Sequence, residues 1–164
     1  MVSRKKIGMI ILCFILLCIK ITILMKLLWK AKNMIDKKDG DIGRLTDYYW
    51  LFEHWINQKN NGMKIEDFFK ENNFREIAVY GMGEPGHLLC NELKGSTVVE
   101  VKYGLDKNFT LKKAIVEVRS LSDNIIPVDA IVVTPISHFH EIRQELKEKY
   151  ECPIISLEDV IYSS

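Results

Sequence analysis

The chain has 164 residues, which is enough for one globular domain and leaves no room for a second, catalytic domain. Its formal net charge is +1, so the chain does not have the excess of basic residues that is typical of nucleic-acid-binding proteins. We therefore expect no nucleic-acid partner. The four cysteines include no C-x-x-C pair, which argues against a disulfide framework or a zinc knuckle and fits a reducing, cytosolic environment.

The first predicted element is an apolar helix within residues 1–38. Residues 7–29 contain fourteen Ile, Leu or Phe residues and are interrupted only by Lys20, Thr22 and Lys26. A lysine in the middle of a span costs about 3 kcal/mol on insertion scales, whereas each of these apolar residues contributes about 0.3 to 0.6 kcal/mol in the favourable direction. The balance predicts a membrane helix with basic flanks.

Two alternatives to a spanning helix remain open. A cleaved signal peptide would explain the basic residues before the apolar run, although no small-residue cleavage site follows it. A helix lying in the membrane interface would explain why Thr22, Lys26, Lys30 and Asn33 recur at helical spacing. Because the larger basic cluster follows the apolar run, we expect attachment to the cell membrane with the C-terminal domain on the cytoplasmic side.

Residues 39–63 are predicted to form a linker and then an amphipathic helix. The polar residues 39–44 include Gly40 and Gly43, a composition typical of a short linker. Apolar and aromatic side chains then recur on one broad helical face: Leu45, Tyr48, Tyr49, Leu51, Phe52, Trp55 and Ile56. We expect this face to pack on the domain or on a second copy of the chain, as in a homodimer; a face that grips a ligand is the alternative.

Residues 64–164 are predicted to form an α/β domain. A short helix at 65–71 precedes five predicted strands, at 76–80, 97–103, about 114–118, 130–134 and 153–156, and three helices, at 85–93, 135–150 and 157–161. Alternating strands and helices predict a small doubly wound parallel sheet of Rossmann-like type, with strand order 3-2-1-4-5. A ligand crevice is expected where the first and fourth strands diverge.

A glycine motif marks the end of the first predicted strand. The segment Gly81-Met82-Gly83-Glu84-Pro85-Gly86 has the G-x-G-x-x-G pattern and lies where a strand should turn into a helix. Such glycines allow a tight turn and close approach of the backbone to a phosphate, and the helix N-terminus favours an anion. Glu84 is the exception, because its carboxylate would compete with an anionic ligand for the same N–H donors.

Three further candidates follow other predicted strands. Asp106 lies twenty residues beyond Gly86, where a carboxylate accepts hydrogen bonds from ribose hydroxyls in such folds; closing a turn is its alternative role. Thr134, before Pro135, is a candidate helix N-cap and crevice residue. His138 is the one weak acid–base candidate. No metal site is predicted, because His138 and His140 are two residues apart on a helix and point away from each other.

Residues 75–83, Gly86 and residues 128–135 resemble small NAD(P)-binding Rossmann-like domains of bacterial surface-polysaccharide biosynthesis proteins. Similar modules occur in sugar acyltransferases, in sugar-nucleotide epimerases and dehydratases, and beside glycosyltransferases. The resemblance implies that Gly81, Gly83 and Gly86 meet nucleotide phosphates and that Asp106 meets the nucleoside sugar. The Tyr-x-x-x-Lys pair of the epimerases and dehydratases is missing after the fourth predicted strand, and so is the β-helix in which the acyltransferases carry out their reaction. The resemblance therefore implies nucleotide binding alone and not catalysis.

Three hypotheses about function result. The first is a membrane-tethered module that binds a nucleotide, NAD(P) or a nucleotide sugar, beside a glycosyltransferase or another polysaccharide-synthesis protein. The second is a non-catalytic interaction or scaffold protein whose Rossmann-like domain has no ligand, which Glu84 favours. The third is a small NAD(P)-dependent oxidoreductase, for which His138 is the only available proton donor.

Overall fold

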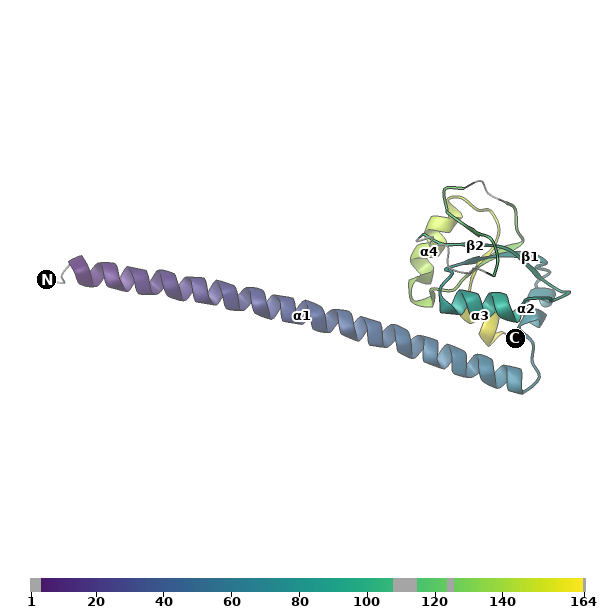
Figure 1. Ribbon diagram of the computed structural model, residues 1–164, viewed down its shortest axis with the longest axis horizontal. Helices are drawn as coiled ribbons and strands as arrows, with labels where there is room; N and C mark the ends of the chain where they lie inside the picture. Colours follow the sequence, from purple (N-terminus) through teal and green to yellow (C-terminus); the bar gives the residue numbers. More distant parts are fainter. Residues whose placement is uncertain (1–3, 108–114, 124–125, 164) are drawn as a thin grey trace. The chain divides into compact units, whose positions relative to one another are not determined.

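The computed structural model describes residues 4–107, 115–123 and 126–163 (Figure 1). It divides into two compact units, Met1–Thr46 and Asp47–Ser164, which we describe separately. Residue 114, where the third strand was predicted to start, lies outside the described residues.

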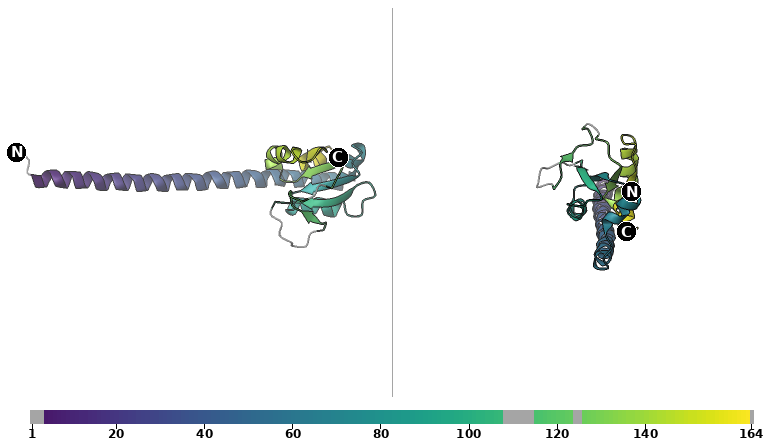
Figure 2. Two further views of the ribbon diagram at one scale, coloured as in Figure 1. Left: turned by 90° about the horizontal axis from the view of Figure 1, so that it is seen from above. Right: turned by 90° about the vertical axis from the view of Figure 1, so that its right-hand side faces the viewer.

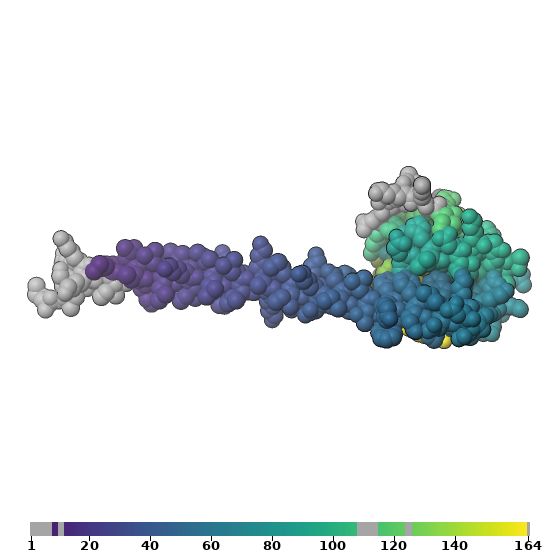
Figure 3. All heavy atoms as spheres, turned by 60° about the horizontal axis from the view of Figure 1, so that its bottom comes forward, coloured from purple at the N-terminus to yellow at the C-terminus, as the bar shows by residue number. Residues whose placement is uncertain are grey.

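The first unit is the greater part of a single helix, α1 (Arg4–Asn60), drawn without a break in Figures 1 and 2. From Leu12 onward it is long and apolar enough to cross a membrane, by length and composition. Large apolar side chains such as Phe14, Leu24 and Trp29 lie exposed on its surface. Figure 3 draws the side chains of this helix as a space-filling surface. At about 1.5 Å per residue, the 57-residue helix far exceeds a bilayer core of about 30 Å.

The predicted linker at residues 39–44 is wrong, because α1 continues through it. Two isolated glycines lower helix propensity by only about 1 kcal/mol each, and no proline accompanies them to remove a helix hydrogen bond. Arg44 pairs with Asp41 one turn earlier, which adds a local contact across the segment. The helix ends instead at Asn60, as predicted, and Gly62 takes the left-handed conformation (φ +81°) that commonly follows a helix C-terminus.

The second unit begins inside α1, earlier than the boundary at residue 64 that the sequence suggested. Leu51 is fully buried and Trp55 nearly so, and both belong to the core of the α/β unit. The predicted packing of the aromatic helix on the domain is therefore confirmed for one side of that helix. Leu45, Tyr49 and Ile56, predicted on the same face, remain exposed.

The second unit is a mixed α/β structure with an all-parallel sheet in the predicted order β3-β2-β1-β4-β5. The strands are β1 (Glu76–Tyr80), β2 (Glu100–Leu105), β3 (Val118–Arg119), β4 (Ala130–Val133) and β5 (Ile154–Ser156). The helices are α2 (Ile65–Glu71), α3 (Glu84–Glu92), the 3₁₀ turn η1 (Ile136–His138), α4 (Phe139–Lys147) and α5 (Leu157–Tyr162). Element types agree with the sequence, while several boundaries differ.

Two of those differences have local causes. β2 starts at Glu100 instead of residue 97, because the Ser96 hydroxyl oxygen accepts hydrogen bonds from the N–H groups of Val98 and Val99 and holds a turn there. The helix predicted from residue 135 starts as η1 and becomes α-helical only at Phe139. Pro135 has no N–H to donate, and the N–H of His138 bonds to its carbonyl.

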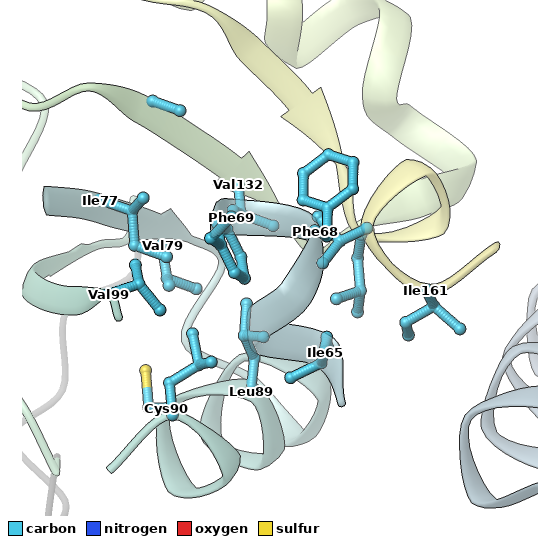
Figure 4. Packing of buried hydrophobic residues seen from close by; sticks show 14 of the residues in the cluster. Ile65, Phe68, Phe69, Ile77, Val79, Leu89, Cys90, Val99, Val132 and Ile161 are labelled. Atoms are coloured by element: carbon cyan, nitrogen blue, oxygen red, sulfur yellow. The ribbon is translucent and has the colours of Figure 1, made fainter. Parts of the chain in front are cut away.

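Apolar side chains alternate between the two faces of the sheet. Ile77, Val79 and Val132 point to one face, which α2, α3, α5 and the end of α1 cover (Figure 4). Tyr80 and Ile131 point to the other face, which α4 covers. This alternation is the period-two geometry of a strand buried on both sides, as the nearly continuous apolar sequences of β1 and β4 require.

Asp129 ties the central strands together at their starts. Its carboxylate accepts hydrogen bonds from the N–H groups of Arg75 and Glu76, at 2.7 and 2.8 Å. These bonds stabilise the charged form, so they hold the pKa of Asp129 below its ordinary value. The result is a fixed register between β1 and β4, whose opposite ends form the candidate site.

Candidate functional site

The candidate site lies at the carboxyl ends of three neighbouring parallel strands. β1 leads into the glycine motif, β2 into Asp106, and β4 into Thr134. Strand order reverses between β1 and β4, which is where open parallel α/β sheets place ligands. The fold therefore brings the sequence-predicted residues of all three segments to one edge of the sheet.

Gly81 and Gly86 close the glycine loop on itself. Gly81 has φ +90°, and a Cβ atom there would lie 2.6 Å from Cδ of Pro135. A Cβ atom on Gly86 would lie 2.3 Å from the Gly81 carbonyl oxygen. Both distances are too short for any other residue unless the backbone moves. These two glycines are therefore required for the turn from β1 into α3 and for its packing against the β4 loop.

Thr134 is a buried support of the loop instead of a helix cap. Its hydroxyl is 2.6 Å from the Gly81 carbonyl oxygen and 3.2 Å from that of Tyr80, and only 2% of the residue is exposed. The predicted N-cap role is wrong, since no side chain caps η1 or α4. The side chain instead satisfies carbonyl groups that the tight turn withdraws from water.

Gly83 and Glu84 form the exposed part of the loop. Gly83 is the N-cap of α3, no side chain caps that helix, and a Cβ atom on Gly83 would have no neighbour closer than Cδ of Pro85, at 3.8 Å. Glu84 is exposed in the first turn, and Pro85 occupies the position where a missing N–H is tolerated. The backbone at Gly83 is consequently open to a ligand, with one carboxylate beside it.

Asp106 is bonded to the loop. Its carboxylate accepts a hydrogen bond from the N–H of Met82 at 2.9 Å and joins the end of β2 to the glycine motif. The Met82 side chain lies over β2, since a Cβ atom on Gly104 would be 2.6 Å from the Met82 sulfur. The sequence predicted neither this hydrogen bond nor its partner. Asp106 positions the loop, and Lys107 beside it pairs with Glu145 of α4 at 2.6 Å.

Replacing Asp106 by alanine is expected to lower the free energy of unfolding by about 1 to 2 kcal/mol, because the Met82 amide loses its charged acceptor. Asp106→Asn keeps an oxygen in the same place and should lose less. Denaturant unfolding of the full chain in detergent, followed by tryptophan fluorescence, measures both. An equal loss in the two variants would show that the hydrogen bond to Met82 is not what stabilises the loop.

Tyr48 is a site residue that the sequence did not identify. Its hydroxyl donates to the Thr134 carbonyl oxygen at 2.9 Å, across 86 positions of the chain, and its ring stacks on Phe52 at 5.9 Å. The residue is half-buried, so this part of α1 lies beside the carboxyl ends of the strands, where the glycine loop is. Only its place on an aromatic helical face was visible in the sequence, and no local pattern tells which face residue will meet a loop so distant along the chain.

His138, the weak acid–base candidate, and Cys90 have surroundings of their own. His138 is exposed, and its Nδ1 atom is 3.6 Å from a carboxylate oxygen of Glu141 in the next turn. Within the described residues, no group of three His, Cys, Asp or Glu side chains is placed to hold a metal ion. Cys90 is buried in the core, and burial raises the pKa of its thiol to about 11.

A comparison of the chain with models of protein families, with curated proteins and with solved structures finds no match in any of the three.

Proposed function

We propose that this protein is a membrane-tethered, Rossmann-like module that binds a nucleotide. The observation that carries the proposal is the geometry of the glycine loop. Gly81 and Gly86 are fixed by contacts that exclude a side chain, whereas the space beside Gly83 is open and the first turn of α3 has no side-chain cap. A folding role accounts for the first two glycines. No such contact explains a glycine at position 83, whereas the close approach of a ligand does.

The ligand class is NAD(P) or a nucleotide sugar. Both place phosphate groups next to a nucleoside, so phosphate oxygens would accept hydrogen bonds from N–H groups at the start of α3. The ribose would lie toward the end of β2. Because Asp106 already accepts the Met82 N–H, its carboxylate would have to serve the loop and a ribose hydroxyl together. The resemblance of residues 75–83, Gly86 and residues 128–135 to modules of polysaccharide biosynthesis supports this class.

The apolar helix α1 determines where in the cell the nucleotide-binding unit would work. α1 supplies one helix that is long and apolar enough to span, and the basic residues that follow its apolar part favour a cytoplasmic second unit. Nucleotide sugars and NAD(P) are cytoplasmic metabolites. A nucleotide-binding unit held at the membrane there would work beside an enzyme of bacterial envelope polysaccharide synthesis, such as a glycosyltransferase.

A second candidate function is a ligand-free interaction domain, and a specific surface favours it. An apolar cavity of about 360 Å³ opens on the second unit between the end of α1 and α3. It is lined by Phe52, Trp55, Ile56, Lys59, Leu88 and Glu92. Leu88 and Ile56 are about half exposed and lie together at this cavity, and contiguous exposed apolar surface marks interaction sites. Glu84 at the loop also favours this alternative.

A thermal-shift experiment distinguishes the two functions. The full chain in detergent is melted with NAD, NADP, their reduced forms, UDP- and GDP-sugars, and free nucleotides. A ligand at one hundred times its dissociation constant stabilises the fold by about 2.7 kcal/mol, which raises the melting temperature by several degrees. Gly83→Val should abolish the shift and leave the ligand-free melting temperature nearly unchanged, because a Cβ atom at this position would have no neighbour closer than 3.8 Å.

Glu84→Gln is the matched test of the loop. Removing the negative charge beside the phosphate position should strengthen nucleotide binding and increase the shift. No gain would show that Glu84 does not face the ligand. If no nucleotide stabilises the wild-type chain or Glu84→Gln, while both melt cooperatively, the interaction domain is the better description.

A further inference from the structure

The part of α1 that follows the apolar span carries a narrow apolar stripe. In residues 31–46 the aliphatic side chains are few: Ala31, Met34, Ile35, Ile42 and Leu45. Ile35, Ile42 and Leu45 are 58%, 61% and 69% exposed, so nothing in their own unit covers them. The remaining residues are charged, polar or glycine. An exposed helix of this composition has one unpartnered face.

The stripe has the spacing of a coiled coil. Leu28, Ala31, Ile35, Lys38, Ile42 and Leu45 follow one another at alternating intervals of three and four residues. Within the apolar span the same spacing continues at Leu24, Ile21, Leu17 and Phe14. Toward the second unit it reaches Tyr49, and the next position, Phe52, packs against the core of that unit. A repeat of seven residues keeps one seam facing a second helix over many turns, which a helix packed on a globular surface does not need.

We infer that this seam pairs with the seam of a second copy of the chain, as a parallel two-stranded coiled coil. Two copies inserted by the same helix enter the membrane in the same direction, so each seam residue meets its own counterpart. Ile35 and Ile42 occupy two of the a positions of the repeat, and Leu45 occupies one of the d positions. Isoleucine at a with leucine at d is the combination that favours two parallel strands.

Charges next to the seam fit a second copy. Lys38 takes a d position, and Asp39 and Asp41 flank the seam in the adjoining e and g positions. In a parallel pair, the Lys38 side chain of each copy lies near the acidic flank of the other. A polar residue at one core position lowers stability but sets the register of the two helices.

A lipid surface is the less suitable occupant. Residues 31–47 contain four basic and four acidic side chains: Lys32, Lys37, Lys38 and Arg44 against Asp36, Asp39, Asp41 and Asp47. The zero balance gives no attraction to anionic lipid, and a seam confined to a and d positions is narrower than the apolar face of an interfacial helix.

Helix stability leads to the same conclusion. Gly40 and Gly43 each cost about 0.5 to 1 kcal/mol in a helix interior, and helices are held mainly by burial of an apolar face. Both glycines occupy outer positions of the repeat, f and b, away from the seam. A coiled-coil partner supplies the burial that this segment lacks in a single copy.

Disulfide cross-linking of the full chain in membranes tests the pairing. Single cysteines at Ile42→Cys and Leu45→Cys lie on the seam, and Gly43→Cys and Arg44→Cys are neighbours off the seam. Cys13 and Cys18, which are exposed, are first replaced by serine; Cys90 and Cys152 stay, because burial raises the pKa of both thiols, and the parent chain is the blank. We expect several-fold more dimer from each seam position than from its neighbour. Equal cross-linking at all four positions, or none, would overturn the proposal.

The copy number gives a second, independent readout. The mass of the full chain in detergent micelles should be that of two copies, and Ile42→Glu with Leu45→Glu should reduce it to one, because like charges would meet in the seam. Gly43→Glu with Arg44→Glu is the matched control and should remain a dimer. A seam variant that stays dimeric would contradict the inference. A monomeric parent chain would contradict it as well. If, in addition, a water-soluble maleimide fails to label the thiol of Ile42→Cys, the stripe lies against lipid.

Discussion

Gly86→Ala is expected to lower the free energy of unfolding of the second unit by about 3 kcal/mol, which corresponds to a melting temperature lower by about 10 °C. The added methyl group would lie 2.3 Å from the carbonyl oxygen of Gly81. That oxygen belongs to the backbone and also accepts the Thr134 hydroxyl, so it cannot move without breaking a second contact. Either α3 shifts away from β1 or the turn after β1 opens.

The matched control for this substitution is Gly83→Ala, three residues earlier in the same loop. Its added methyl group would have no neighbour closer than 3.8 Å, and its backbone angles suit any residue. We expect a change within about 0.5 kcal/mol. Thermal melting of the two variants in detergent, followed by circular dichroism, measures the difference. Equal stability of Gly86→Ala and Gly83→Ala would mean that the loop is not closed in the way described above.

Leu51→Ala is the second substitution with a large expected effect. Leu51 lies on α1 but is fully buried in the core of the α/β unit, so its truncation removes apolar contacts and leaves a cavity. Such losses cost about 2 to 5 kcal/mol. Trp50→Ala, on the same helix and outside the seam inferred above, removes a side chain that is 57% exposed and should cost much less, about 0.5 kcal/mol. Denaturant unfolding of the full chain measures both changes.

Chain truncation provides the counterpart of that test. A chain that starts at Asp47 keeps Leu51 and Trp55 and is expected to unfold cooperatively. A chain that starts at residue 64, the domain boundary suggested by the sequence, lacks both and should unfold at a much lower denaturant concentration. Similar stability of the two truncated chains would show that the end of α1 is an appendage instead of a core element.

Much of the α/β unit was predictable because its signals are local. The apolar segments of β1 and β4 are buried on both faces, and glycine or asparagine ends helices where the chain must turn, as Gly62 and Asn73 show with positive φ angles. Short crossovers between such elements allow few arrangements of a parallel sheet, which is why the strand order could be inferred without coordinates.

Boundaries and side-chain roles were less predictable because they depend on distant partners. Residues 39–44 have the composition of a linker, yet nothing in two isolated glycines is strong enough to end α1. Thr134 has the sequence context of a helix cap, but its hydroxyl bonds to carbonyl groups of the β1 turn, more than fifty residues away. Packing of the loop after β4 against the turn after β1 decides that the hydroxyl bonds to these carbonyl groups and does not cap the helix.

The sequence alone determined the apolar helix, the alternation of strands and helices, and the glycine motif between β1 and α3, because each depends on residues close together in the chain. Only the tertiary structure decided that α1 enters the core through Leu51 and Trp55, that Asp106 holds the Met82 amide, and that Tyr48 bonds to the loop after β4. Those contacts join segments that are distant in the chain. Their geometry follows from how the helices and the sheet pack together, which no local pattern of residues encodes.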